Sequence, residues 1–159
     1  MELEKIFESN RIVFINLSEL YIDDYIKMYT DSNIQKSLFK KEYDYDTIIN
    51  WIKKEINEKE KYSFSMIDKS TKEFIGNIEI VQKEEAAEIM ISITPSKQGK
   101  HYATEAIGSI IEFGQNELGI SQYDLNVYKN NGKAVHIYKK AGFIEDGNNL
   151  TDDSIHMKL

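Results

Sequence analysis

Hydrophobic residues in the first third of the chain recur at the spacing of a strand and then of two helices. A short β-branched run over residues 11–15 predicts a first strand, and Ser18 is a suitable cap for the helix that follows. One face of that helix carries Ile22, Tyr25, Ile26 and Tyr29. A second amphipathic helix is predicted to start at Asp46 or Thr47. Its apolar side is formed by Tyr45, Ile48, Ile49, Ile52 and Ile56.

The hydrophobic period then changes to that of a strand. Apolar and polar residues alternate over 62–66, and after a polar turn at 68–72 a returning strand is predicted over 74–81. A third strand is predicted over 88–93, where three isoleucines share one face. Together these three strands predict an antiparallel meander.

The second half of the chain alternates helices with short strands. A loop over 96–102 leads into a predicted helix over 103–118. Gly119 is well placed to end that helix, because glycine readily adopts the left-handed conformation found just after a helix. A further strand is predicted over 123–128.

The chain closes with a predicted helix and two short strands. Asn131 is suited to cap the helix and Gly142 to end it. Closing strands are predicted over 143–145 and 155–159. The predicted order, βααβββαβαββ, belongs to the α/β (α+β) class, with helices on the faces of a sheet. Because no internal repeat or linker divides the chain, residues 1–159 are predicted to form a single domain.

The amino-acid composition excludes several classes of protein. A length of 159 residues suits one domain with a sizeable core. The absence of cysteine excludes disulfides, thiolate catalysis and cysteine zinc sites. No apolar run approaches the roughly 18 residues of a membrane span, and the first five residues lack the apolar region of a signal peptide. A cytoplasmic protein with no membrane partner is therefore expected.

Charge is unevenly distributed along the chain. Lys and Arg number 20 against 27 Asp and Glu, a net charge of −7 that disfavours non-specific nucleic-acid binding. Residues 97–140 nevertheless contain six lysines and four acidic residues, a balance of +2, so the other 115 residues carry −9. Chance clustering and an anion-binding segment are both compatible with this balance.

The loop over residues 98–103 combines glycine and lysine with the start of a predicted helix. A helix N-terminus carries partial positive charge and unsatisfied N–H groups, so it favours phosphate. Gly99 allows close approach of the backbone, and Lys97 and Lys100 add positive charge. The loop therefore predicts a phosphate-bearing ligand, with an ordinary strand-to-helix connection as the alternative.

The motifs around this loop resemble those of a known family. Residues 98–106 read Q-G-K-H-Y-A-T-E-A and are similar to the Q/R-x-x-G-x-G/A motif of the GNAT N-acetyltransferases. Residues 131–143 resemble the N-x-x-A-x-x-x-Y-x-x-x-G-F motif of that family, at a fitting separation. Residues 10–17 are similar to the opening strand of the ribosomal-protein and polyamine acetyltransferase branches. The resemblance implies the GNAT fold, a mixed, mostly antiparallel central sheet flanked by helices.

The same resemblance implies acetyl-CoA as co-substrate, with no metal, and direct transfer of the acetyl group to an amine. The loop amides would hold the CoA pyrophosphate. The strand before the loop would diverge from its neighbour near Asn126 and pair its free backbone with the pantetheine arm. The residues implied in CoA binding are Ile91, Ser92, Ile93, Gln98, Gly99, Lys100, His101, Tyr102, Ala103, Thr104, Asn126, Asn131 and Tyr138.

The resemblance also implies an acid and a base. Tyr138 matches the tyrosine that protonates the leaving thiolate, while packing in the core is the alternative for a tyrosine on an apolar helix face. Glu88 matches an acidic position common in the family and is the first candidate for the base, although a solvated strand end would also explain it. Glu79 is the second candidate. Some N-terminal acetyltransferases have a glutamate where this chain has Asn126.

The histidines depart from the family pattern or lie apart from one another. His101 replaces the usual second glycine of the loop, and a helical backbone with a solvent-facing side chain is expected there. An altered fit to CoA, or a contact of the protonated ring with phosphate, is the alternative. His136 is expected to be peripheral. With His156, the three histidines lack the spacing of metal ligands.

The acceptor site is expected from the two N-terminal helices, over about residues 18–56, and from the final hairpin with its short loop at 146–153. The first region is acidic and aromatic, which suits a cationic amine such as a polyamine. A protein N-terminus is the alternative acceptor. A non-catalytic acyl-CoA sensor of the same fold and an unrelated nucleotide-binding α/β protein are the rival functions. A homodimer is compatible with the sequence.

Overall fold

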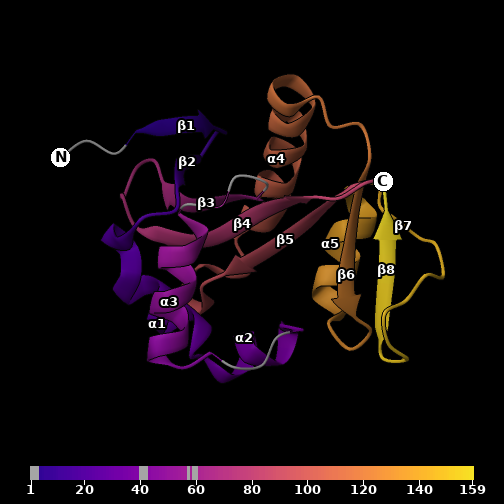
Figure 1. Ribbon diagram of the computed structural model, residues 1–159, viewed down its shortest axis with the longest axis horizontal. Coiled ribbons are helices and arrows are strands. Elements are labelled where there is room, and N and C mark those ends of the chain that lie inside the picture. Colours follow the sequence, from indigo (N-terminus) through magenta and orange to yellow (C-terminus); the bar gives the residue numbers. More distant parts are fainter. Residues whose placement is uncertain (1–3, 40–42, 57, 59–60) are drawn as a thin grey trace.

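An eight-stranded sheet with helices on both faces forms the framework of the computed structural model, which describes residues 4–39, 43–56, 58 and 61–159 (Figure 1). The strands are β1 (Lys5–Glu8), β2 (Ile12–Asn16), β3 (Lys61–Asp68), β4 (Phe74–Gln82), β5 (Ala87–Ile93), β6 (Tyr123–Tyr128), β7 (Ile144–Glu145) and β8 (Ser154–Lys158). The helices are α1 (Ile22–Tyr29), α2 (Ser32–Ser37), α3 (Tyr45–Glu55), α4 (Tyr102–Leu118) and α5 (Gly132–Lys140). Two 3₁₀ turns are η1 (Glu19–Tyr21) and η2 (Pro95–Lys97).

The spatial order of the strands is β1-β2-β3-β4-β5-β6-β8-β7. Every neighbouring pair among them is antiparallel except β5 and β6, which are parallel. The predicted meander is confirmed as β3-β4-β5, and the mixed, mostly antiparallel sheet is confirmed with it.

Successive residues of the strands pack on opposite faces of the sheet. Phe14 and Met66 belong to the core that α4 and α5 cover, whereas Ile15 and Ile67 belong to the core beneath α1, α2 and α3. Because both faces are covered, β3 and β4 are buried along most of their length. The alternation predicted over 62–66 therefore separates two packed faces, and does not separate a core face from a solvent face.

Capping residues set where the N-terminal helices begin. Ser18 caps η1 and not α1, because its Oγ accepts a hydrogen bond from the amide of Leu20 at 3.3 Å. α3 begins slightly before its predicted start, at Tyr45, because Asp44 Oδ1 accepts from the amide of Thr47 at 2.8 Å.

The elements from α4 onward lie close to their predicted ranges. Gly119 ends α4 with a φ of 67°, as predicted. Asn131 caps α5 with Oδ1, which accepts from the amide of Ala134 at 3.4 Å. Gly142 also has a positive φ, 103°, just past the end of α5.

Two short elements are missing from the predicted order. β1 pairs with β2 at the edge of the sheet, and α2 begins at the cap Asp31, whose carboxylate accepts from the amides of Asn33 and Ile34. α2 has six residues and buries only Ile34 among them. Elements this short show no hydrophobic period that sequence analysis could detect.

The strands β5 and β6 diverge after a short paired segment. They pair only at Ala87 with Tyr123 and at Glu88 with Asp124, and Figure 1 shows a wide angle between the two strands beyond that point. β5 stays paired with β4, and β6 with β8, over the rest of their lengths. The divergence expected beside Asn126 is therefore confirmed, and it leaves one backbone edge of each strand without a neighbouring strand.

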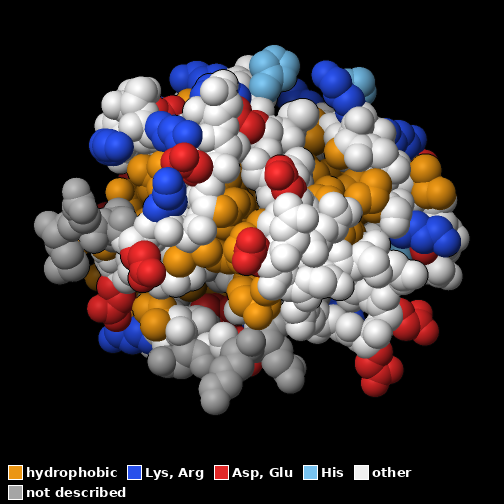
Figure 2. All heavy atoms as spheres, turned by 90° about the horizontal axis from the view of Figure 1, so that it is seen from above, with side chains coloured by type: hydrophobic (Ala, Val, Ile, Leu, Met, Phe, Trp, Pro, Cys, Tyr) orange, Lys and Arg blue, Asp and Glu red, His pale blue; other side chains and the backbone are white. Residues whose placement is uncertain are grey.

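The outer surface is mixed in charge. Figure 2 looks onto the side of β1 and α4, where blue basic and red acidic side chains are interspersed with exposed hydrophobic ones. In the part of the chain that the structure describes, no helix is both long and apolar enough to cross a membrane.

Candidate active site

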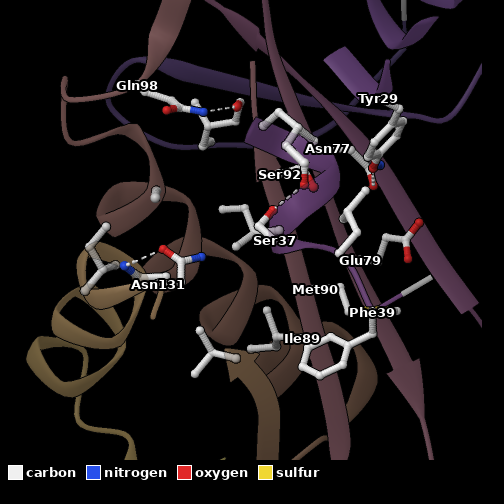
Figure 3. A pocket seen from close by; sticks show the side chains of 18 of the residues that line it. Tyr29, Ser37, Phe39, Asn77, Glu79, Ile89, Met90, Ser92, Gln98 and Asn131 are labelled. Atoms are coloured by element: carbon white, nitrogen blue, oxygen red, sulfur yellow. Dashed lines mark hydrogen bonds between the residues drawn. The ribbon is translucent and has the colours of Figure 1, made fainter. Parts of the chain in front are cut away.

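A cleft of about 1250 Å³ opens where β5 and β6 diverge (Figure 3). One half is lined by the free edge of β5, the loop before α4, and α5. The other half is lined by α2, α3, the end of α1 and a short stretch of β4. The sheet therefore positions two different walls around one opening.

The predicted CoA residues gather in the first half of the cleft. Of the thirteen residues predicted for CoA binding, all except Lys100 line it. Lys100 is exposed outside the lining, and Lys97, which does line the cleft, is ion-paired with Glu73. The positive charge expected from these two lysines is therefore less available to the cleft than the sequence suggested.

The loop before α4 has an unusual backbone at His101. The helical conformation expected there is wrong, because His101 has φ 66° and ψ 17°, which is left-handed. Histidine thus keeps a conformation suited to glycine, at a cost of roughly 1–2 kcal/mol. Its side chain is exposed, as expected, and makes no capping hydrogen bond to the first turn of α4. Backbone N–H groups at this helix end are left without a side-chain cap.

Two amides fix the ends of this wall. Gln98 Nε2 donates to the carbonyl of Ile93 at 2.9 Å and ties the loop to β5 (Figure 3). The Oδ1 of Asn131 accepts from the amide of Ala134 and so caps α5 (Figure 3). The first bond holds the loop against β5, and the second defines where α5 begins.

A basic stripe on α5 was missed by sequence analysis. Lys133, His136 and Lys140 all line the cleft and are spaced i, i+3 and i+7 along the helix. The peripheral position expected for His136 is therefore wrong. Lys139 differs from these residues, because its ammonium pairs with Glu145 at 3.1 Å and it does not line the cleft. Helical spacing of basic residues was the signal that could have revealed the stripe.

Tyr138 lies beside this stripe with its ring buried. It is 9% exposed, lines the cleft, and packs its ring edge-on to Phe143 at 6.3 Å between centroids. Burial raises the pKa of Tyr138 to about 12. Its hydroxyl is therefore protonated at neutral pH and can donate a proton.

Glu88 does not face the cleft. Its carboxylate accepts from Asn126 Nδ2 at 2.8 Å and pairs with Lys83 at 2.6 Å. It lies where β5 still pairs with β6, before the strands diverge. The position of Glu88 therefore does not support the expectation that it contacts the acceptor. The hydrogen bond to Glu88 orients the side chain of Asn126.

Glu79 faces the second half of the cleft. It is only 5% exposed, and Ser63 Oγ donates to its Oε1 at 3.1 Å. Lys61 Nζ lies 3.3 Å from Glu79 and 3.0 Å from Glu55, which lines the cleft as well. Burial raises the pKa of Glu79, and the Lys61 ammonium offsets that rise in part. Two carboxylates thus share the Lys61 ammonium, and because Lys36 and Lys54 also line this half of the cleft, its charged groups are of both signs.

Aromatic rings complete the second half. Tyr29 stacks on Tyr43 at 5.2 Å and meets Trp51 edge-on at 5.5 Å, and its hydroxyl donates to Asn77 Oδ1 at 3.2 Å. Figure 3 shows Tyr29, Asn77 and Glu79 together across the cleft from Gln98 and Asn131. Phe39 stacks on Tyr128 at 4.4 Å and so links the end of α2 to β6.

Only part of the expected acceptor region lines the cleft. Tyr29 and Tyr43 line the cleft, but Asp31 and Asp44 cap helices instead. Residues 40–42 of that region lie outside the described residues. The closing hairpin was expected to contribute, yet none of residues 143–159, all of which are described, lines the cleft. A lone carboxylate in the apolar run of β4 was the sequence signal for Glu79 in the cleft.

Comparisons with known proteins agree with this geometry. The family model of the acetyltransferase (GNAT) domain matches residues 11–144. Spermidine N(1)-acetyltransferase of Vibrio cholerae serotype O1 is 29% identical over 119 residues, which cover 72% of this chain and 68% of that protein. Its counterpart in Escherichia coli (strain K12) is 40% identical over 70 residues, but these span only 44% of this chain and 38% of the relative.

Solved structures share the fold. The spermidine N-acetyltransferase from Vibrio cholerae, solved in complex with CoA and spermine, aligns with a TM-score of 0.83 at 24% identity, covering 94% of this chain and 95% of that one. A GNAT-family acetyltransferase from Bacillus anthracis aligns with a TM-score of 0.85 at 17% identity, covering 96% of each chain.

Proposed function

Since the chain belongs to the GNAT acetyltransferase family, we propose that it acetylates a primary amine of a small polyamine by direct attack in a ternary complex with acetyl-CoA. The observation that carries the proposal is one cleft whose two walls have complementary chemistry. One wall offers loop amides and a basic stripe, and the other offers buried carboxylates and aromatic rings. The curated relatives named spermidine acetyltransferases support the choice of acceptor.

The first wall suits a long, anionic thioester. The free edge of β5 at Ile91 has backbone groups available to a pantetheine arm, and buried backbone groups require partners. At Ile93 the carbonyl already accepts from Gln98. The amides of residues 98–103 and the start of α4 suit a pyrophosphate. Lys133 and Lys140 add positive charge along the same wall. When bound, acetyl-CoA supplies the acetyl group as an activated thioester.

The second wall suits an elongated cation. Glu55 and Glu79 offer buried carboxylates beside the lysines of this wall, Lys36, Lys54 and Lys61. The rings of Tyr29, Tyr43 and Trp51 attract ammonium groups through their faces. The stack of Phe39 on Tyr128 bridges the two sides of the opening, which favours a slender acceptor over a bulky one. A polyamine combines small width with several positive charges.

Two side chains of the protein, Glu79 and Tyr138, are proposed to transfer the protons of the reaction. Glu79, opposite Met90 on the neighbouring strand, takes a proton from the acceptor ammonium, so that the neutral nitrogen forms a bond to the carbonyl carbon. As the carbon–sulfur bond breaks, Tyr138 donates its proton to the leaving thiolate. We assign the base to Glu79 in place of Glu88, because Glu79 lines the cleft and Glu88 does not.

A panel of amines tests the acceptor. Release of free thiol from acetyl-CoA is measured with spermidine, an aminoglycoside and a peptide with a free N-terminus. We expect the highest kcat/KM with spermidine. A higher value with the peptide would identify a protein N-terminal acetyltransferase. CoA binding without thiol release from any acceptor would identify a sensor, and binding of a mononucleotide but not of CoA would identify a nucleotide-binding protein.

A cytoplasmic location and a homodimer remain predictions.

A further inference from the structure

Arg11 is the only arginine among the 20 basic residues of this chain. It lies immediately before β2, at the sheet end next to the loop that precedes α4. The other 19 basic residues are lysines, so a guanidinium at this position calls for a physical reason.

The guanidinium contacts the loop and the helix at three points. Arg11 Nε donates to Glu105 Oε1 at 2.8 Å, and Nη1 donates to the carbonyl of Lys100 at 3.0 Å. The same group lies 4.3 Å from the ring centroid of Tyr102. A planar guanidinium can make these contacts together, whereas the compact ammonium of lysine lacks both the fork and the flat face.

The partners of Arg11 are themselves fixed. Glu105 Oε2 accepts from the amide of Arg11 at 2.8 Å and from the hydroxyl of Ser9. Tyr102 donates its hydroxyl to Asp68 Oδ2 at 2.6 Å, in the turn between β3 and β4. Hydrogen bonds from Tyr102 and from this turn hold the pKa of Asp68 well below its usual range. The start of α4 is therefore tied to two separate parts of the sheet.

His101 lies between the two anchored residues Lys100 and Tyr102. It has the left-handed backbone described above, which is costly for a residue other than glycine and persists only where the surroundings impose it. The contacts of Arg11 to Lys100, Tyr102 and Glu105 lie on both sides of this position, and the hydrogen bond from Tyr102 to Asp68 adds a restraint on one side only.

We propose that Arg11 is a positioning residue that holds the strained loop in its binding conformation, so that the loop amides are already arranged for the pyrophosphate of CoA. The inference rests on the proposed CoA site. It explains how the loop keeps its conformation although residue 101 is a histidine and not a glycine. Arg11 touches the loop and not the reacting atoms, so its effect is on binding.

A double-mutant cycle tests this role. CoA affinity is measured by calorimetry for the wild type, Arg11→Lys, His101→Gly and the double variant. We expect Arg11→Lys to weaken CoA binding about tenfold when His101 is present. A loss of this size is expected if the Arg11 contacts no longer compensate the backbone strain of roughly one residue. We expect a loss of less than about threefold in the His101→Gly background, where glycine removes the strain. Equal losses in both backgrounds overturn the proposal.

Lys72 provides a matched control. It is the other described non-glycine residue with a positive φ, 64°, and it lies in the turn between β3 and β4. Lys72→Gly relieves similar strain elsewhere, so it should leave the tenfold effect of Arg11→Lys in place. If Lys72→Gly suppresses that effect as well as His101→Gly does, the rescue reflects general stability and the proposal is wrong.

Hydrogen exchange gives a readout that needs no ligand. Amides over 98–104 should exchange faster in Arg11→Lys than in the wild type, while those in β3 and β4 should be unchanged. Glu105→Gln, which removes the charge opposite Arg11, should act in the same direction. Uniformly faster exchange would indicate global destabilisation and overturn the positioning role. A wild type that binds no CoA would instead overturn the proposed cofactor site, and the role of Arg11 with it.

Discussion

At the scale of single residues, burial shifts two titratable side chains in the sense that their proposed roles require. Tyr138, with a pKa raised to about 12, keeps its proton at neutral pH and can deliver it to a thiolate. Burial also raises the pKa of Glu79, against the opposing charge of Lys61, which makes its carboxylate a stronger base than an exposed one. The environment of each side chain therefore suits the role proposed for it.

Replacing Tyr138 by phenylalanine removes the proposed acid and keeps the ring. We expect kcat with spermidine to fall by about 10²-fold, the usual size of a general-acid contribution. Because the ring still packs against Phe143, CoA binding measured by calorimetry should be unchanged. An unchanged kcat would remove Tyr138 from the acid role.

Glu79 should set the acidic limb of the pH profile. A base must be ionised, so kcat/KM should fall as pH decreases through the raised pKa of Glu79, above the value of about 4.3 for an exposed glutamate. In Glu79→Gln that limb should disappear together with most of the activity. Glu88→Gln is the control and should retain the limb. Loss of the limb in Glu88→Gln alone would reverse the assignment.

The predicted acid, Tyr138, lies in the cleft, whereas the first predicted base, Glu88, lies outside it for a structural reason. Tyr138 and the loop residues stand at recognisable spacings, so a local motif locates them. Glu79 lies on β4 and Glu88 lies on β5, and these two strands pair with each other. What separates the two glutamates is how far along this strand pair each one lies. Glu88 stands where β5 still pairs with β6, and Glu79 lies opposite Met90, where that pairing has ended. The point of divergence depends on the packing of the whole sheet and has no local signal.

At the scale of elements, β5 is central because its free edge forms one wall of the cleft. Its position depends on close contact with β4 at Gly76. A Cβ at Gly76 would lie 2.0 Å from the carbonyl oxygen of Ser92, which is backbone and cannot move without shifting β5. The glycine therefore sets how closely β5 approaches β4.

Gly76→Ala should displace β5. We expect a loss of about 1–3 kcal/mol in the free energy of unfolding, measured by urea denaturation, together with weaker CoA binding. Gly108→Ala in α4 is the matched control, because a Cβ there meets nothing within 4 Å. It should raise stability by about 0.5–1 kcal/mol, since alanine favours the helix. Similar results for both variants would contradict the account of β5.

The closing hairpin should make stability depend on pH through His156. This ring lies 2.8 Å from Asp124 and 2.7 Å from Asp146. Burial alone would lower its pKa, but the two carboxylates outweigh burial and raise it. The stabilisation is therefore complete below the unfolded-state pKa of about 6.5 and lost as pH rises through the higher folded-state value. Thermal melting from pH 6 to pH 9 should show a larger loss for the wild type than for His156→Gln. Equal losses would contradict this role.

Sequence analysis predicted the long elements well and the short ones poorly. The meander and α4 have enough residues to show a hydrophobic period. β1 and α2 are defined by pairing at a sheet edge and by the cap Asp31, which act through contacts and not through periodicity. The left-handed backbone of His101 was also missed, because histidine adopts this conformation rarely and no local signal at residues 98–103 indicates it.

At the scale of the whole molecule, the net-positive segment of the sequence contributes the basic stripe of one cleft wall. The segment 97–140 includes Lys133 and Lys140 of that stripe. The acidic remainder supplies Glu55 and Glu79 to the opposite wall, together with lysines, so that wall holds charges of both signs. The anion-binding chemistry of the cleft is therefore concentrated on the wall of α4 and α5.

The basic stripe should act through charge. We expect the double variant Lys133→Met and Lys140→Met to bind CoA about tenfold more weakly at low salt, with a difference that shrinks as ionic strength rises. Lys139→Met is the control, because Lys139 pairs with Glu145 outside the cleft. An effect of Lys139→Met as large as that of the double variant would contradict a specific role for the stripe.

The central claim is that this cleft brings acetyl-CoA and a polyamine together for direct transfer. Its most direct test is the initial rate of thiol release from acetyl-CoA with increasing spermidine, with the product identified by mass spectrometry. We predict saturable thiol release matched by an equal amount of monoacetylated spermidine. No acetylated spermidine, from protein that binds CoA, would contradict the claim.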